Sequence, residues 1–248
     1  MPVRRFALAT ASVAAAAAGA DILSVSGDAV LVPAPPSVEP GVLESDGVVH
    51  VFIERDERLT AEAFVVDISE PGSVSPIGTD TYAAGALSPS DVPPGTLVES
   101  VYLHADPVTK QTGFTGRVNF DREIIGLIIR PASFDASDAE TASPTTVYGP
   151  ERQIGEGDTV RITSDRTAVV FSFVTGGGTD QIRVLVSADP PCNPADLAPI
   201  FGRLDLADIS AFVSAFTGGD PAGDLNEDGI FDLTDIGIFV TAFTGGCP

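Results

Sequence analysis

The stretch Asp224-Leu-Asn226-Glu-Asp228-Gly229-Ile-Phe-Asp232-Leu-Thr-Asp235 decides the fold of the C-terminal part of this chain. Oxygen-bearing side chains occupy positions 1, 3, 5, 9 and 12 of these twelve residues, and glycine occupies position 6. Calcium takes six to eight oxygen ligands, and this spacing wraps such ligands around one ion. The glycine allows the sharp turn that directs the next carbonyl at the metal. We therefore predict one calcium site, formed by Asp224, Asn226, Asp228, Asp232, Asp235 and the carbonyl of Ile230.

The same stretch has a second interpretation, as an acidic turn that leads into helix caps. Asp232 suits an N-cap position, and Asp235 lies three residues later, where a carboxylate favours the helix start. Capping explains these two residues but not Asp224, Asn226 and Asp228 together with the glycine. Calcium loops of this kind usually carry glutamate at the last position, where this chain has aspartate.

The chain carries an earlier copy of this loop and of the segment after it. Five positions recur 27 residues later: Gly202, Asp205, Asp208, Phe212 and Phe216. The first copy begins at Asp196 and contains one extra residue. It has Ala198 and Ile200 where side-chain oxygens are expected, so we predict that the first loop is degenerate and holds no metal.

Each loop leads into a short amphipathic helix. Apolar residues recur at i, i+3, i+4 and i+7 in both copies: Ile209, Phe212, Val213, Phe216 and Ile236, Phe239, Val240, Phe243. Gly218 and Gly245 are the expected left-handed stops. Helices of this length do not persist alone in water, so the two apolar stripes should pack on each other.

Two loop–helix repeats with an Asp-x-Asn-x-Asp-Gly loop closed by Asp resemble a dockerin, a small all-α, EF-hand-like module. The resemblance covers about residues 192–248, and the ending Gly246-Cys247-Pro248 is similar to the planctomycete variant that ends in Gly-Cys. Dockerins dock onto a cohesin and attach their cargo to a scaffold or cell surface. The resemblance thus implies a cohesin-like protein or surface scaffold as partner, and it assigns the same residues of the second loop to calcium.

The only two cysteines, Cys192 and Cys247, flank the repeats. In an exported chain such a pair predicts a disulfide. Closing a segment of this length contributes on the order of 4 kcal/mol in the chain-entropy model.

A partner-binding surface is expected on the outward side of the two helices. Ser210, Ser214, Gly237 and Thr241 lie off the apolar stripes, and small side chains let another protein approach closely. The alternative is that they simply face water, as about half of any small helix does. Because the repeats are similar, a partner could bind in either of two orientations.

Residues 1–20 are predicted to be an export signal. Arg4 and Arg5 precede an apolar stretch, and Ala18-Gly19-Ala20 is a small-residue cleavage site. No later stretch is long and apolar enough to span a membrane, so we expect a secreted protein, extracellular or at the cell surface, without membrane insertion after cleavage. The formal net charge of −22 disfavours nucleic acid and anionic membranes as partners.

Residues 21–187 are predicted to form a domain of a different class, an antiparallel β-sandwich of jelly-roll type, joined to the C-terminal module by a linker at 188–191. Short runs rich in Val, Ile, Thr and Phe alternate with clusters of Gly, Pro, Ser and Asp. The expected strands are 22–26, 29–32, 48–54, 63–68, 97–104, 116–120, 124–130, 145–148, 159–163, 168–174 and 181–187. Stretches 96–104 and 120–128 resemble secreted sandwich domains of poorly defined role, and this resemblance assigns no catalytic residue.

The sandwich carries no catalytic motif. Glycoside hydrolysis needs two carboxylates at a set separation, and the acidic candidates are not paired by any motif: Glu54, Glu62, Glu99 and Asp121. His50 and His104 lie in expected strands and are predicted to be buried or cross-strand histidines.

Three polar residues, Asp135, Ser137 and Asp138, are predicted to form a turn, with a structural calcium loop as the alternative. Sugar stacking is disfavoured because tryptophan is absent and only three tyrosines occur. We therefore expect an exported, non-enzymatic sandwich with a docking module. The alternative is a secreted polysaccharide-active enzyme or carbohydrate-binding protein with the same anchor.

Overall fold

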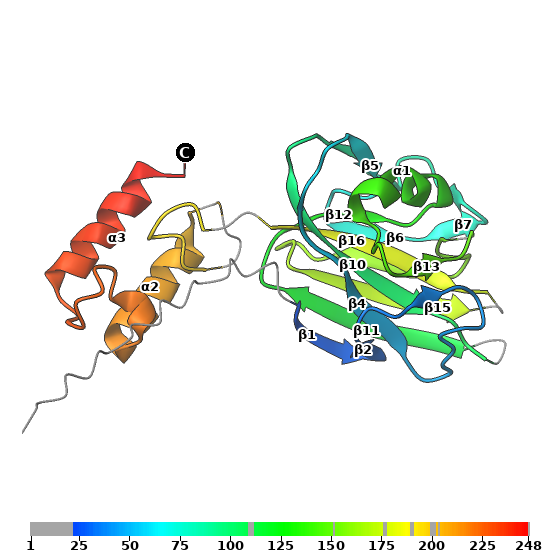
Figure 1. The fold of residues 1–248 in the computed structure, drawn as a ribbon, viewed down its shortest axis with the longest axis horizontal. Helices are drawn as coiled ribbons and strands as arrows, with labels where there is room; N and C mark the ends of the chain where they lie inside the picture. The colour runs from blue at the N-terminus through cyan, green and yellow to red at the C-terminus, as the bar shows by residue number, and fades with distance from the viewer. Residues whose placement is uncertain are drawn as a thin grey trace, which may run out of the picture.

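The computed structural model describes residues 22–108, 112–150, 152–175, 178–188, 191–198, 202 and 204–247. Two five-stranded sheets form the first part, and two helices lie near the C-terminus (Figure 1). The prediction of a mainly β, sandwich-like unit followed by a small helical one is thus confirmed. The expected export signal lies outside the described residues, as does part of the expected linker.

The first sheet is antiparallel throughout. Its strands, in spatial order, are β1 (Ile22–Gly27), β11 (Thr112–Phe120), β15 (Ala168–Thr175), β14 (Thr159–Ile162) and β6 (Gly72–Val74). The second sheet has the order β12 (Ile124–Ile128), β16 (Asp180–Ser187), β10 (Leu97–Ala105), β4 (Val49–Leu59) and β2 (Ala29–Leu31).

The second sheet departs from the expected antiparallel pattern at one edge, where β2 pairs in parallel with β4. The two strands are separated by a long excursion, as a parallel connection requires, and not by a hairpin. Six short strands form separate two-stranded sheets: β13 (Val147–Tyr148) with β3 (Ser37–Val38), β5 (Phe64–Val66) with β9 (Ser90–Val92), and β7 (Pro76–Gly78) with β8 (Thr81–Tyr82). The first of these pairs is also parallel.

The sandwich has two hydrophobic cores. The larger one lies between the sheets and combines residues of both, for example Phe171 and Phe173 of β15 with Val101 and Leu103 of β10. The second covers the outer face of the second sheet, where Tyr102 packs among residues of α1 and the short strands. Nearly every residue of β10 and β16 is therefore buried, whichever face it points to.

A helix that the sequence did not predict, α1 (Pro131–Thr141), covers this outer face (Figure 1). The prediction of a turn or calcium loop at Asp135, Ser137 and Asp138 is therefore wrong. The helix has no apolar stripe, because small and polar residues alternate along it, and its N-cap residue makes no side-chain cap. Burial of Ser137 and ion pairs of Asp138 hold the helix in place instead.

The helical unit comprises α2 (Leu206–Gly218), the short 3-10 turn η1 (Pro221–Gly223) and α3 (Leu233–Gly245). The rings of Phe212 and Phe239 are buried and stack with centroids 4.2 Å apart, so the two helices pack as predicted. Val213 and Val240 do not join this contact, because they are 52% and 51% exposed. Each helix has a single helical neighbour, so a narrower apolar stripe than the sequence pattern indicates is sufficient to form the contact between the two helices.

Both helices also end one residue later than predicted. Gly218 and Gly245 are the last helical residues, and the positive φ falls on Gly219 and Gly246. Either glycine of each Gly-Gly pair can adopt this backbone conformation, so sequence alone does not decide between them. Within the described residues, no helix has the length and apolar character needed to cross a membrane.

Candidate functional site

The second loop gathers three of the predicted calcium ligands through hydrogen bonds. The amide of Gly229 donates to Asp224 Oδ2 at 2.7 Å, and the amide of Ile230 donates to Asp228 Oδ1 at 2.8 Å. The side-chain amide of Asn226 donates to Asp228 Oδ2 at 2.9 Å. Gly229 has a φ of 78°, which allows the turn expected at this position. Asp224, Asn226 and Asp228 are thus neighbours on one side of the loop.

Asp235 has a different role in this structure. It is fully buried, and its carboxylate accepts three backbone amides: Oδ1 from Leu225 at 2.9 Å and Asn226 at 3.4 Å, and Oδ2 from Asp232 at 3.0 Å. The side chain of Asp232 caps α3 by accepting the amide of Thr234, and this bond lowers the pKa of Asp232. The capping interpretation of Asp232 and Asp235 therefore describes real contacts.

The first loop has the same frame of hydrogen bonds. Asp208 Oδ1 accepts the amides of Leu197 and Ala198, both at 2.9 Å, and Asp208 Oδ2 accepts the amide of Asp205 at 2.8 Å. Asp196 Oδ2 accepts the amide of Gly202 at 2.6 Å, just as Asp224 accepts that of Gly229. Gly202 shares the positive φ of its counterpart.

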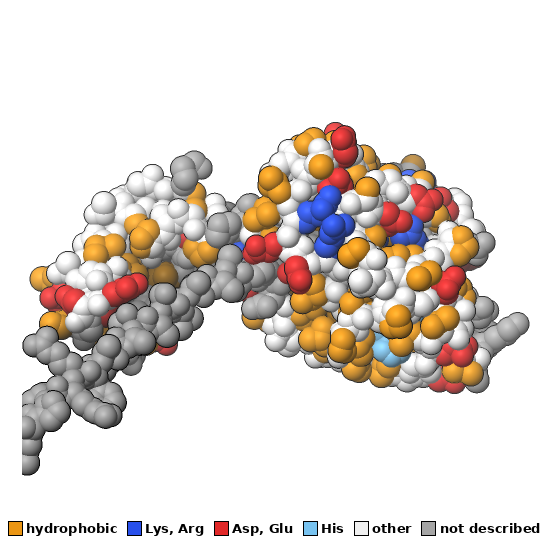
Figure 2. Space-filling model, in the orientation of Figure 1, with side chains coloured by type: hydrophobic (Ala, Val, Ile, Leu, Met, Phe, Trp, Pro, Cys, Tyr) orange, Lys and Arg blue, Asp and Glu red, His pale blue; other side chains and the backbone are white. Residues whose placement is uncertain are grey.

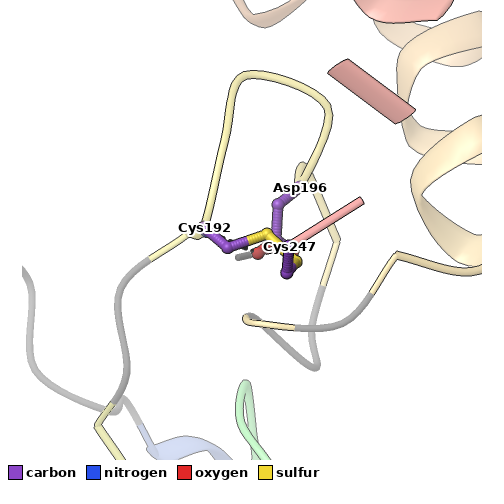
Figure 3. A group of neighbouring side chains, drawn as sticks. All are labelled: Cys192, Asp196 and Cys247. Atoms are coloured by element: carbon purple, nitrogen blue, oxygen red, sulfur yellow. Dashed lines mark hydrogen bonds between the residues drawn. A yellow bond between two sulfur atoms is a disulfide. The ribbon is translucent and has the colours of Figure 1, made fainter. Parts of the chain in front are cut away.

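The first loop differs in the residues that surround this frame. Asp196 is only 2% exposed and lies against the disulfide between Cys192 and Cys247, and it also accepts the Cys192 amide at 2.7 Å (Figure 3). The predicted disulfide is present, with the two Cα atoms 5.5 Å apart. Ala198 is buried where the second loop has the exposed Asn226, and Ile200 lies outside the described residues.

The donors of the second loop suit a hard cation, because every one is an oxygen. Within the described part of the chain, only Cys192, Asp196 and Cys247 place three potential metal-binding atoms of Cys, His, Asp or Glu within 4.8 Å of one another. The disulfide uses both of these thiols, so this cluster is not a metal site. The second loop does not gather its carboxylates as closely, since both oxygens of Asp235 face amides.

The outward side of the helices carries the predicted partner-binding residues. Ser210, Ser214, Gly237 and Thr241 are all exposed. The last two line a shallow cavity of about 570 Å³ on α3, together with Leu233, Thr234, Ile238 and Ala242.

The sandwich contains a buried ionic network that the sequence interpretation missed. Arg183 is fully buried on β16 and donates to Glu54 of β4 through two bonds of 2.7 and 2.6 Å. It also donates to Ser137 and Asp138 of α1, at 2.7 and 3.0 Å. Arg152 donates to both oxygens of Asp138 at 2.7 Å. The one available signal was Arg183 directly between Ile182 and Val184 in a predicted strand, because a buried guanidinium needs a carboxylate partner.

The arginines of this network set the environment of Asp138 and Glu54. Burial alone would raise the pKa of Asp138, but the hydrogen bond from Arg152 and the charge of Arg183 outweigh it and lower that pKa. Glu54, one of the candidate acids, accepts hydrogen bonds from Arg183 on both of its carboxylate oxygens.

The two histidines face each other across neighbouring strands, as predicted. His104 of β10 is the register partner of His50 of β4 and is fully buried. Burial, and then the proximity of His50, lower the pKa of His104 to about 4. His104 is therefore a neutral core residue at physiological pH.

Comparisons with protein-family models, with curated proteins and with solved structures each returned no match.

Proposed function

We propose that this protein is an exported, non-enzymatic β-sandwich that is attached to a surface or extracellular scaffold protein by its helical module. The observation that carries this proposal is a duplicated apolar face. Leu206 and Leu233 begin α2 and α3 at equivalent positions, and they are 78% and 81% exposed. Val213 and Val240 form a second equivalent pair, each about half exposed.

Single exposed apolar residues are ordinary on protein surfaces, but matching pairs on two repeats are not explained by chance alone. The hydroxyls between them support the apolar character of this face. Ser210 and Thr241 each donate to a carbonyl of their own helix, at 2.9 and 2.7 Å. Their polar atoms are therefore satisfied within the helix. Figure 2 shows hydrophobic side chains on the visible face of the helical unit, with acidic ones gathered toward one end.

Calcium in the second loop would prepare this face for binding. Asp224, Asn226 and Asp228 would hold the ion, with the Ile230 carbonyl, Asp232 and Asp235 completing the oxygen set. The ion would offset the repulsion among these carboxylates and order the loop that leads directly into Leu233. The dockerin-like character of the module, with a cohesin-like partner, is part of this proposal.

Two finer points belong to the same proposal. We infer a jelly-roll arrangement for the sandwich, supported by successive strands that change sheets from β10 to β11 and from β11 to β12. The disulfide is consistent with an extracellular location. The alternative of a polysaccharide-active sandwich gains no support from Glu54, which Arg183 holds.

The test uses the full exported chain immobilised as bait for envelope extracts. We expect the wild type to capture a protein from the extract when calcium is present. Capture should be lost when calcium is chelated, and it should also be lost in the double variant Leu206→Asp/Leu233→Asp. The matched control is Leu23→Asp/Leu59→Asp on β1 and β4, which adds the same two charges at exposed leucines of the sandwich. Equal capture by the double variant, or loss of capture in the control alone, would place the binding surface on the sandwich.

A further inference from the structure

A pocket in the sandwich, distant in sequence from the second loop, is lined by Asp180, whose buried carboxylate lies beside that of Asp158. Asp158 immediately precedes β14 and is fully buried, and Asp180 begins β16 and is 7% exposed. Asp180 lines a cavity of about 270 Å³ together with Gln153, Gly155, Glu156, Val174, Gly178 and Thr179. Gly155 lies between the two carboxylates: a Cβ there would be 3.6 Å from Asp180 Oδ1 and 3.7 Å from Asp158 Oδ2.

Two oxygens at this cavity are buried without a hydrogen-bond partner, Asp180 Oδ2 and Gln153 Oε1. Leaving a buried oxygen unpaired costs free energy. Asp158 is held differently, because its oxygens accept the amides of Gly155 at 2.5 Å and Val174 at 2.6 Å. Burial raises the pKa of Asp158 on balance, and these two bonds oppose that rise and fix the orientation of the carboxyl.

Among the ion pairs of the described residues, none includes Asp158 or Asp180. Burial, and then the charge of Asp158, raise the pKa of Asp180 to about 8. Without a cation, Asp180 therefore keeps its proton near neutral pH and hydrogen-bonds to Asp158; both carboxylates ionise together there only when a cation lies between them.

We propose that this pocket is a second calcium site, held by Asp158, Asp180 and Gln153. All three side chains offer oxygens, two of which lack any partner, and neither nitrogen nor sulfur donors are needed. The cavity leaves room for the waters that complete the calcium shell. The site would stabilise the sandwich independently of the loop in the helical module.

Calcium bound per chain, measured by equilibrium dialysis of the full chain, tests this site. We expect two ions in the wild type, one in Asp228→Ala, which disables the loop, and none in Asp228→Ala/Asp180→Asn. The matched control Asp228→Ala/Asp91→Asn removes an exposed carboxylate of β9 and should still bind one. A wild type with one ion that Asp180→Asn removes would support this site and refute the loop site.

Thermal unfolding shows whether each variant is folded, so that a folding defect is not mistaken for a lost calcium site. In chelator, Asp180→Asn should be about as stable as the wild type, because the asparagine amide can replace the protonated carboxyl as the hydrogen-bond donor to Asp158. In calcium, it should lack the rise in the sandwich Tm that the wild type shows. The proposal is overturned if Asp228→Ala binds no calcium, because Asp158 and Asp180 would then only share a proton. It is also overturned if Asp228→Ala/Asp180→Asn still binds one ion.

Discussion

The two loops of the helical module have the same frame and different contents. In each, a buried aspartate, Asp208 or Asp235, accepts three backbone amides and ties the loop to the first turn of its helix. The first loop keeps this frame with Ala198 in place of Asn226, so the frame does not depend on a polar side chain at that position. Under the proposed function, loop shape and calcium binding are therefore separable properties of one sequence pattern.

The loops also differ in the contacts that stabilise them from outside. The first is packed against the Cys192–Cys247 disulfide, which buries Asp196. The second leaves Asn226 and Asp228 exposed. We interpret the disulfide as the support of the first loop and calcium as the proposed support of the second.

Removing the disulfide should have the largest effect on this comparison. Cys192→Ser/Cys247→Ser opens a constraint across 55 residues, which the chain-entropy model values at about 4 kcal/mol. Urea unfolding of the module should show this loss, and hydrogen exchange should rise more in the first loop than in the second. Equal increases in both loops would contradict a specific role of the disulfide in the first.

The shared frame predicts equal costs for its two central aspartates. Asp208→Ala and Asp235→Ala each leave three amides without their acceptor, so each should lose about 3 kcal/mol of unfolding free energy in chelator. Only Asp235→Ala should also change the response to calcium. Denaturant unfolding with and without calcium gives both quantities, and clearly unequal losses in chelator would refute a common frame.

Protonation of histidine at low pH should affect the stability of the sandwich and not that of the module, because both histidines lie in the sandwich. Folding holds His104 neutral, with its pKa lowered to about 4, while the unfolded chain takes up the proton below its ordinary value of 6.5. Through His104, falling pH therefore favours the unfolded sandwich by about 2 kcal/mol at pH 5 relative to pH 7, whereas Asp180, whose pKa is raised, favours the folded sandwich over the same range.

The groups around His104 are His50, whose positive charge would oppose protonation, and Asp106, whose carboxylate lies 4.0 Å from Nε2. NMR titration of the imidazole gives its pKa directly, and the stability of His104→Gln relative to the wild type should rise as the pH falls from 6.5 to 4. An imidazole that titrates near 6.5 in the folded protein would disprove this account. The comparison of the loops can then be made at pH 7, where this effect is absent.

The smallest expected effect concerns the exposed valines. Val213→Thr and Val240→Thr replace a methyl by a hydroxyl at half-exposed positions, so each should change stability by no more than about 0.5 kcal/mol. Calorimetric melting of the two variants checks this. A loss of several kcal/mol from either one would mean that the two helices are packed differently.

The helix pattern of the two repeats and the pairing of the two cysteines were predicted correctly from the sequence, whereas the buried ion pairs between distant segments of the sandwich were not. The loop spacing, the capping residues and the Phe212–Phe239 contact all depend on short sequence patterns within the two repeats. Helix α1 could not be predicted in this way, because Arg152 and Arg183 from later segments hold its polar face. The burial of both faces of β10 depends on that helix, and the exposure of Val213 depends on how many neighbours α2 has.

The central claim is that the second loop binds calcium and the first does not. The amides of Gly229 and Gly202 donate to equivalent carboxylates, Asp224 and Asp196, so they are matched reporters of the two loops. A calcium titration followed by amide NMR of the full chain measures both at once. We predict that the Gly229 resonance moves with added calcium and saturates, while the Gly202 resonance stays in place. Equal movement of both resonances, or movement of neither, would contradict the claim.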